Sequence, residues 1–243
     1  MRTASRTGLA LVIVMLSGLG GCKAPNGGVT PRGLLKFAFG PSPKKLAEQA
    51  FESPDPDVRR KAVVRLSSHS WGRAEPYLKG YAAIVTAEIR KRGDRRHPTL
   101  ICAALRALGR AGGATYLSHV LVALKDPSPE VRWDAAAALD NMIGEEAVVA
   151  LRSSALSDAS VDVRAACCRA LRHYRRQDVI NTLVRCLGDD EFAVRYQAHR
   201  TLKDLAGRDF GPDGADWAGV RLDKLPVGTE KKKPWWNPIN WFR

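Results

Sequence analysis

The chain has 243 residues, 45% of them hydrophobic, and its 39 lysines and arginines against 25 aspartates and glutamates give a formal net charge of +14. A chain of this length can bury a sizeable core, and its charge favours anionic partners such as lipid head groups, acidic polymers or nucleic acid. The sequence contains no HExxH, CxxC or GxSxG motif and no phosphate-binding glycine loop, which argues against the enzyme classes that depend on them.

Residues 1–21 have the pattern of a secretion signal. A positively charged start precedes the apolar run Leu9–Leu19, which is too short to cross about 30 Å of hydrocarbon. The run ends in Leu19-Gly20-Gly21-Cys22, which resembles a lipobox, where the cysteine is acylated and becomes the new N-terminus. We therefore predict lipidation at Cys22. The alternative is an ordinary signal peptide, in which Cys22 has no such role.

Residues 22–42 read as a tether that contains glycine, proline and lysine. The second residue of the mature chain would be Lys23, and not the aspartate that retains bacterial lipoproteins at the inner membrane. The resemblance to lipoproteins thus implies a lipid-anchored protein of the bacterial cell envelope, at the outer membrane and facing the periplasm.

A nine-residue pattern recurs five times along the middle of the chain, and its last four copies start 31 or 32 residues apart. Each copy has an apolar residue at position one, a small residue at position five and leucine at position nine, which places them on one helical face. Self-similarity at this period predicts a solenoid of stacked helical hairpins. The five windows are Val58–Leu66, Leu100–Leu108, Val131–Leu139, Val163–Leu171 and Val194–Leu202.

The residues around these windows predict the helix ends and the remaining helices. Proline stands two residues before the first and third windows, and Asp55, Ser128 and Ser160 are in position to act as N-caps. A second apolar helix fits after the second, third and fourth windows, and a short helix fits before the first one. The predicted ranges are 44–51, 115–124, 145–156 and 178–187.

The repeats resemble the short bacterial HEAT-like (PBS-lyase HEAT-like) repeats, through a loop aspartate, a Val-Arg pair and a helix with small residues before its leucine. The resemblance implies an all-α, right-handed α-solenoid of about five helical hairpins over residues 43–207. It also implies that loop aspartates and arginines of neighbouring repeats pair as a ladder. The implied ladder residues are Asp126, Arg132, Asp158, Arg164, Asp189 and Arg195, with Arg59 as a weaker member. Ile101 replaces the arginine in the second repeat, so we expect the ladder to break there.

Residues that depart from the repeat are candidates for partner binding. The long first spacing carries a dense basic cluster, which is either a solvated helix end or a ligand patch. Its members are Arg90, Lys91, Arg92, Arg95 and Arg96, followed by His97. Arg152 stands in an apolar column and either lines a surface or extends out of the core. We expect the second helices to line the concave face of the solenoid, with Arg152 and Arg185 as contacts there.

The cysteines and histidines form no recognisable metal or catalytic site. Cys167 and Cys186 are expected on facing helices, where either a disulfide or two buried thiols would fit. Cys168 and His199 share a column, but a metal needs three or four ligands. We expect no catalytic residues, no metal and no cofactor. We expect no nucleic acid partner either, because a secretion signal would separate the protein from it.

Two segments follow the last repeat. Residues 208–230 contain Phe210 and Trp217, which we expect to cover the open end of the solenoid as a cap. Residues 231–243 combine three tryptophans with basic residues, which either contact a membrane–water interface or pack against the domain. The candidate contacts for membrane or cell-wall polymer are Lys231, Lys232, Lys233, Trp235, Trp236 and Trp241.

Together these patterns favour a non-enzymatic protein–protein interaction scaffold held at the cell envelope by Cys22. One alternative is an envelope protein that binds anionic lipid or cell-wall polymer through its basic aromatic tail. Another is an accessory or lyase-like HEAT-repeat protein. The sequence does not identify the protein partner.

Overall fold

The structure is a computed structural model that describes residues 42–225, and all elements below belong to the unit that begins at Pro43. The predicted signal peptide, Cys22, the tether and the basic tail lie outside the described residues. Within residues 42–225 the regular structure consists of α-helices and short 3-10 helices, without strands. The prediction of an all-α repeat fold is confirmed.

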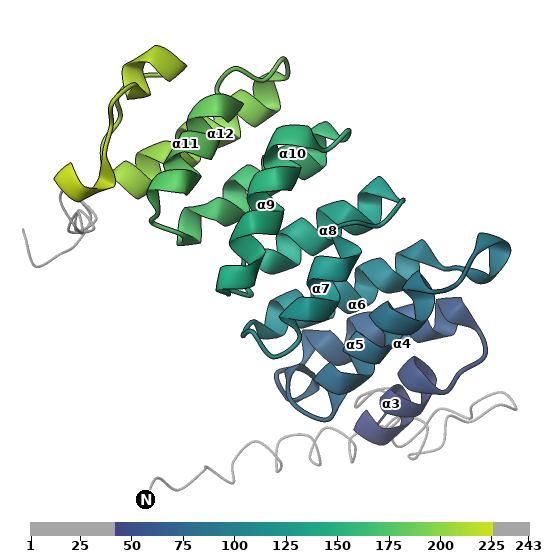
Figure 1. Cartoon of the computed structure of the whole chain (residues 1–243). Helices are drawn as coiled ribbons and strands as arrows, with labels where there is room; N and C mark the ends of the chain where they lie inside the picture. The colour runs from purple at the N-terminus through teal and green to yellow at the C-terminus, as the bar shows by residue number, and fades with distance from the viewer. Residues whose placement is uncertain (1–41, 226–243) are drawn as a thin grey trace, which may run out of the picture. The chain divides into compact units, whose positions relative to one another are not determined.

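The α-helices form two alternating sets (Figure 1). The first set, here called the inner helices, contains the five repeat windows, except that Leu171 begins the 3-10 turn after its helix. Its members are α4 (Pro56–Ser68), α6 (Pro98–Ala111), α8 (Pro129–Leu139), α10 (Val161–Ala170) and α12 (Phe192–Ala206). The second set, the outer helices, fills the spaces between them. Its members are α3 (Pro43–Phe51), α5 (Tyr77–Ile89), α7 (Leu117–Ala123), α9 (Glu145–Ser157) and α11 (Gln177–Cys186).

Each inner helix pairs with the outer helix that precedes it, so that the hairpins are α3–α4, α5–α6, α7–α8, α9–α10 and α11–α12. The sequence analysis placed the repeat window in the first helix of each hairpin, and this order is wrong. The helix before the first window is likewise half of the first hairpin. The short loops that contain Asp126, Asp158 and Asp189 each join an outer helix to the inner helix that follows it. The two helices on either side of such a loop therefore form one hairpin.

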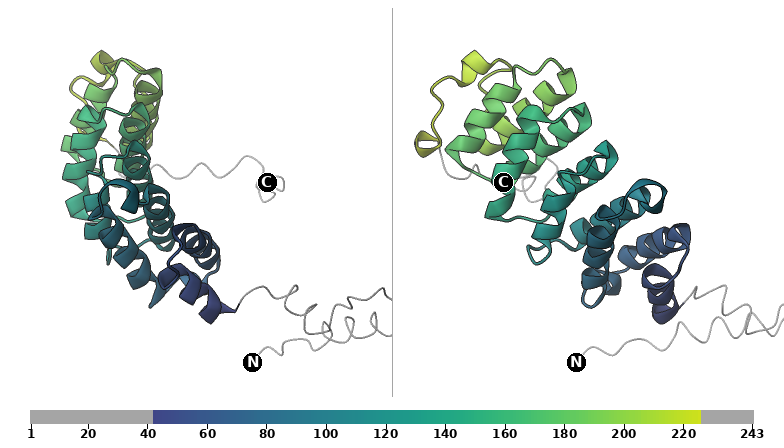
Figure 2. Two further views of the ribbon diagram at one scale, coloured as in Figure 1. Left: turned by 90° about the vertical axis from the view of Figure 1, so that its right-hand side faces the viewer. Right: turned by 45° about the vertical axis from the view of Figure 1, so that its right-hand side comes forward.

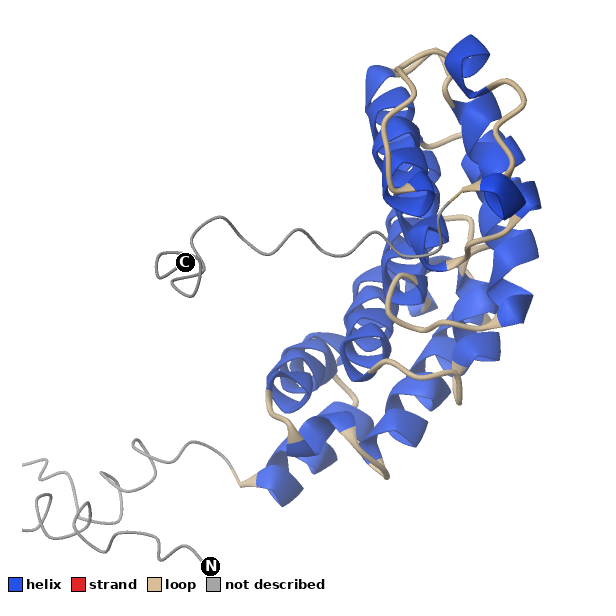
Figure 3. Cartoon of the chain, turned by 90° about the vertical axis from the view of Figure 1, so that its left-hand side faces the viewer, coloured by secondary structure: helices blue, strands red, loops and turns tan. Residues whose placement is uncertain are grey.

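The two layers differ in how closely their helices pack. Neighbouring inner helices contact one another more extensively than neighbouring outer helices, and in Figures 2 and 3 they lie on the inner side of the curved stack. Small residues allow this approach: a Cβ atom on Gly109 of α6 would lie only 2.9 Å from the Cα of Ala138 on α8. The expectation that the helices after each window line the concave face is therefore wrong.

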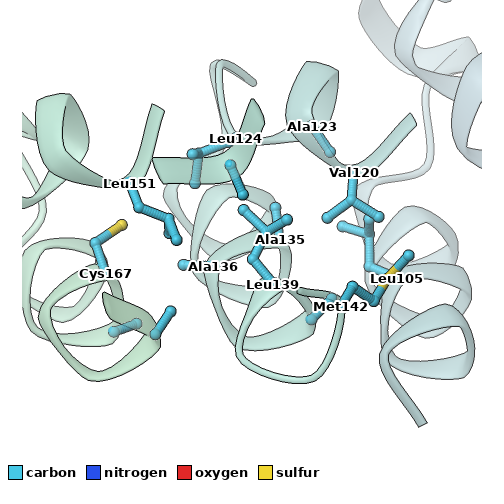
Figure 4. Close-up of a cluster of buried hydrophobic side chains, with 14 of the residues drawn as sticks. Leu105, Val120, Ala123, Leu124, Ala135, Ala136, Leu139, Met142, Leu151 and Cys167 are labelled. Atoms are coloured by element: carbon cyan, nitrogen blue, oxygen red, sulfur yellow. The ribbon is translucent and has the colours of Figure 1, made fainter. Parts of the chain in front are cut away.

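The core follows the columns of the repeat. Side chains at positions five and nine of every window are buried, and so are those at position one, except Val58 at the end of the stack, which is half-buried. Figure 4 shows Ala135 and Leu139 of α8 between the neighbouring helices, with Leu124 and Leu151 from the outer layer and Cys167 from α10. The four cysteines of the described range, Cys102, Cys167, Cys168 and Cys186, are buried free thiols.

An arginine–aspartate ladder joins successive hairpins. Arg132 of α8 donates to both carboxylate oxygens of Asp158 at 2.8 and 2.9 Å, and Arg164 of α10 donates to Asp189 at the same two distances. Each arginine also donates to the backbone carbonyl of its own loop aspartate. The hydrogen bond from Arg164 lowers the pKa of Asp189. These are the pairs that the family resemblance implied.

The loop aspartates also bind the backbone at the start of three inner helices, α8, α10 and α12. Asp126, Asp158 and Asp189 each accept the backbone N–H two residues further on, at 2.9 to 3.0 Å. Ser128 and Ser160 stand at the N-cap positions of α8 and α10 but make no side-chain capping bond, so this part of the sequence prediction is wrong. The aspartate takes over the role because its carboxylate is already held in the loop by the arginine. Only at α4 does the predicted cap, Asp55, accept from the helix directly.

The ladder does not break at Ile101, contrary to the sequence expectation. Arg96, which follows the 3-10 turn η2 (Gly93–Arg95) in the long first spacing, pairs with both oxygens of Asp126. The Asp126 side chain is fully buried, and that of Arg96 is 12% exposed. The guanidinium that pairs with Asp126 thus comes from the loop before α6 and not from α6 itself. Arg96 in the long first spacing therefore takes the place of the arginine that is absent at position 101.

At both ends of the ladder the arginines donate hydrogen bonds to backbone carbonyls. Within residues 42–225 no inner helix follows α12, and its Arg195 donates to the backbone carbonyls of Asp189 and Asp190, both at 2.7 Å. Arg59 in the first inner helix donates to the carbonyl of Ala50 and lies 3.6 Å from the buried Glu88 carboxylate.

The segment after α12 folds over the end of the stack. Trp217, in the 3-10 turn η4 (Gly214–Trp217), is 2% exposed and donates through its indole N–H to the carbonyl of Gly211 at 2.7 Å. The Phe210 ring packs edge-on against it, with 5.0 Å between ring centroids. Both aromatic residues therefore lie where a cap of the solenoid would place them.

Substitution of Arg96 tests its place in the ladder. Arg96→Ala leaves the buried Asp126 carboxylate without its cation and should lower the free energy of unfolding by about 3 kcal/mol, because a buried charge that loses its partner is strongly destabilising. The adjacent Arg95 is exposed, so Arg95→Ala should change the free energy of unfolding by less than about 0.5 kcal/mol. Urea denaturation followed by circular dichroism measures both. Equal effects of the two substitutions would contradict the assignment.

Candidate partner-binding groove

A groove of about 780 Å³ crosses the outer layer between the end of α5, α7 and α9. Its origin is a mismatch of helix length, since α7 has seven residues whereas α5 and α9 have 13 each. A helix of two turns cannot fill the space between two longer neighbours. We call this feature the outer groove.

Apolar side chains form much of the surface of the outer groove. Val122 of α7 is 57% exposed and Val149 of α9 is 71% exposed, and Ile89, Leu121 and Ala150 lie beside them. Exposed apolar residues that lie singly need no explanation, but several of them in one depression are typical of a binding surface.

The edge of the outer groove carries a surplus of positive charge. Arg90, Arg92 and Lys125 are exposed and line it, against one exposed acid, Glu146. Asp126 also borders the groove, but Arg96 neutralises its carboxylate. A ligand in the groove therefore meets an apolar floor and a net positive edge.

A smaller hollow of about 280 Å³ extends this surface toward α5. It shares Ile89, Arg90 and Val122 with the outer groove and adds Ser118 and His119 of α7. The two depressions together form one strip that runs across three outer helices.

The structure divides the basic cluster that the sequence analysis singled out. Arg90 and Arg92 line the outer groove. Lys91 is engaged with the buried Glu88 carboxylate at 2.6 Å, and Arg95 is exposed but does not line the groove. Arg96 does not line the groove, and its guanidinium pairs with Asp126 in the ladder.

Arg152 and Arg185 do not line a concave face, since α9 and α11 are outer helices. Arg152 donates to the hydroxyl of Thr182 at 2.9 Å and to Asp178 at 2.6 Å, both on α11. It is therefore a cross-link between two hairpins, which explains a charged residue in an apolar column. Arg185 is exposed on α11 and lies outside the outer groove.

The sequence analysis missed Val122, Val149 and Lys125. A signal was present, because the buried residues of α9 are Ala147, Val148, Leu151 and Ala155, and Val149 falls off that stripe. An apolar residue outside the core-facing stripe indicates an exposed apolar surface. That Val122 would share a depression with it depended on the shortness of α7, which the repeat period does not reveal.

Two histidines of the described residues lie at hydrogen-bonding distance from aspartates. His199 lies 2.7 Å from Asp209, and this hydrogen bond lowers the pKa of Asp209 to about 2. His173 lies 3.0 Å from Asp140. Between residues 42 and 225, no three histidines, cysteines or acids gather in a way that could hold a metal ion. In the same range, none of the helices combines the length and the apolar character that a membrane span needs.

Comparison with protein families decides the classification of these repeats. A family model described as HEAT repeats matches residues 86–160 and 149–216, which together make up more than half of the chain. The chain belongs to the HEAT-repeat family. The matched HEAT repeats include α6 to α12, and the first hairpin, which lies before the matched residues, continues the same packing.

Solved structures share this HEAT-repeat architecture. The complex of CpcE and CpcF of phycocyanin lyase from Nostoc sp. PCC7120 matches with a TM-score of 0.59 and 21% identity, over 77% of this chain and 69% of that one. An engineered protein matches with a TM-score of 0.52 and 19% identity, over 71% of this chain and 84% of that one. At these identities the likeness shows the fold alone. A comparison with curated proteins gave no match.

Proposed function

We propose that this HEAT-repeat protein is a non-enzymatic interaction scaffold that binds an amphipathic helix of a protein partner in its outer groove. The family and the fold support a role in protein interaction. The observation that carries the proposal is the outer groove itself, where Val122 and Val149 are exposed beside Arg90, Arg92 and Lys125.

The chemistry of the groove specifies the kind of helix. An apolar stripe of the partner would cover Val122 and Val149, because helix-in-groove recognition is driven by burial of such a stripe. Acidic residues along the edges of that stripe would face the positive edge of the groove. A partner helix that is basic at these positions would meet like charge and bind weakly.

We further propose that Cys22 is lipidated and holds the scaffold at the bacterial cell envelope, at the outer membrane and facing the periplasm. The support is the sequence of residues 1–22, with its short apolar run and its Leu-Gly-Gly-Cys ending. The tether of residues 22–42 would then separate the lipid from the repeats. Such an anchor confines the scaffold to one surface, where its partner is encountered at high local concentration.

Photo-crosslinking tests the outer groove. A photoreactive residue at position 122 or 149 should crosslink one envelope protein through a helix with acidic residues beside its apolar stripe. The same residue at position 64 is the control, because Val64 is 42% exposed but lies on α4 outside the groove. The double variant Arg90→Glu, Lys125→Glu should reduce recovery of the crosslinked protein at least tenfold. Equal crosslinking from position 64, or recovery that this variant leaves unchanged, would refute the assignment.

Metabolic labelling tests the anchor. The wild-type protein should incorporate labelled palmitate and fractionate with outer membranes, whereas Cys22→Ser should do neither and lose the partner from a crosslinked pull-down of envelope membranes. Lys23→Asp should keep the label but move to the inner membrane. Unchanged fractionation and no label in the wild type would leave an ordinary signal peptide as the explanation.

A second candidate function rests on residues 231–243, where three tryptophans stand among lysines and arginine. This composition suits binding of anionic lipid or cell-wall polymer. Unlipidated protein carrying Cys22→Ser should then bind vesicles of anionic phospholipid, and deletion of residues 231–243 should abolish the binding. Binding that survives the deletion would exclude the tail as its source. An accessory or lyase-like role has only the likeness of fold to support it.

A further inference from the structure

The inner layer carries a second depression, which differs from the outer groove in position and in charge. It has a volume of about 430 Å³ and lies between α6, α8 and α10. Three of its residues are acids, Glu130, Asp134 and Asp162, and a tryptophan lies among them. The lining residues are Arg106, Pro129, Glu130, Trp133, Asp134, Ser160 and Asp162. We call it the Trp133 pocket.

Asp134 has an unusual environment for a buried carboxylate. Its side chain is 1% exposed, and Oδ1 accepts from Nε of Arg106 at 2.6 Å. Oδ2 is buried, and no nitrogen or oxygen atom of residues 42–225 donates a hydrogen bond to it. By contrast, both carboxylate oxygens of Asp158 and of Asp189 accept hydrogen bonds in the ladder. A buried charged oxygen without a donor is unfavourable, and a donor that reached it would be bound strongly.

Cys102 does not supply a strong donor to this carboxylate. Burial, together with a hydrogen bond to Asp134 and the charge of that carboxylate, raises the pKa of the Cys102 thiol to about 12, so that it stays protonated. A protonated thiol is only a weak hydrogen-bond donor. Arg106, which holds Oδ1, lines the same pocket and is 56% exposed.

The rest of the Trp133 pocket suits a planar cation. Trp133 is 38% exposed, and a tryptophan face is the best aromatic surface for a guanidinium. Glu130 and Asp162 are exposed at the N-termini of α8 and α10. A hydrogen bond from Ser128 lowers the pKa of Glu130, which is ionised at neutral pH even without this shift. Three carboxylates thus face one arginine, on a chain with a net charge of +14.

We propose that the Trp133 pocket binds an arginine side chain of a protein partner. The guanidinium would stack on the Trp133 ring and donate toward Asp134 Oδ2, with Glu130 and Asp162 at the rim. Arginine fits better than lysine, because it is flat and presents several donors in one plane. This site does not depend on the outer groove. It would allow the solenoid to hold one partner by an acidic helix on its outer layer and a basic residue on its inner layer.

The test compares a cation with its neutral isostere. Acetyl-arginine methylamide and acetyl-citrulline methylamide are titrated into the full chain carrying Cys22→Ser and ¹⁵N label. The indole N–H signal of Trp133, assigned by its loss in Trp133→Phe, should shift saturably with the arginine probe and at least tenfold more weakly with citrulline. Equal binding of the two probes, or no shift of this signal, would overturn the proposal.

Variants identify the pocket residues. The double variant Glu130→Gln, Asp162→Asn removes two exposed charges and should weaken the arginine probe at least fivefold, and Asp134→Asn should also weaken it. Glu146→Gln, a matched change in the outer groove, should leave it unaltered, as should Val122→Asp. Deletion of residues 231–243 should have no effect either. Tighter binding after that deletion would mean that the chain's own basic tail occupies the pocket, and binding that the acidic variants leave unchanged would place the probe elsewhere.

Discussion

The arginine–aspartate ladder is the constraint on which the rest of this structure depends. One loop carboxylate accepts from an arginine of the preceding repeat and from the backbone at the start of its own inner helix. A helix start and the register between two hairpins are thus fixed by a single group. Because these carboxylates are largely buried, each must be paired. That requirement explains why an arginine from the loop before α6 occupies the place that Ile101 leaves vacant.

The ladder and the small residues of the inner helices together determine where surfaces for partners arise. Inner helices pack closely, as Gly109 against Ala138 shows, whereas outer helices are spread apart. A short outer helix such as α7 then opens a groove between its neighbours. On the inner layer a depression forms instead where helix starts bring acids together, as at the Trp133 pocket. One architecture therefore offers a basic apolar surface on one layer and an acidic aromatic surface on the other.

In a scaffold of this kind, the residues that stabilise the fold are different from the residues that are available to bind a partner. The buried columns and the loop aspartates are fixed by packing and charge, and Arg152 shows that even a charged residue in a core column can serve the fold. Exposed residues such as Val122, Val149 and Trp133 belong neither to the buried columns nor to the ladder. They are the positions at which one HEAT-repeat chain can differ in function from another.

The sequence by itself determined the helix windows and the buried columns, because these features recur at a fixed period and at helical spacing. The arginine–aspartate pairs of the later repeats followed from the resemblance to HEAT-like repeats. The sequence did not determine which helices form hairpins, which layer is the inner one, or that Arg96 would complete the ladder. Arg96 and Asp126 lie 30 residues apart, and the outer groove depends on the length of α7 relative to α5 and α9. Only the tertiary structure decided these points, since contacts between distant segments follow from how the hairpins stack and not from any local pattern.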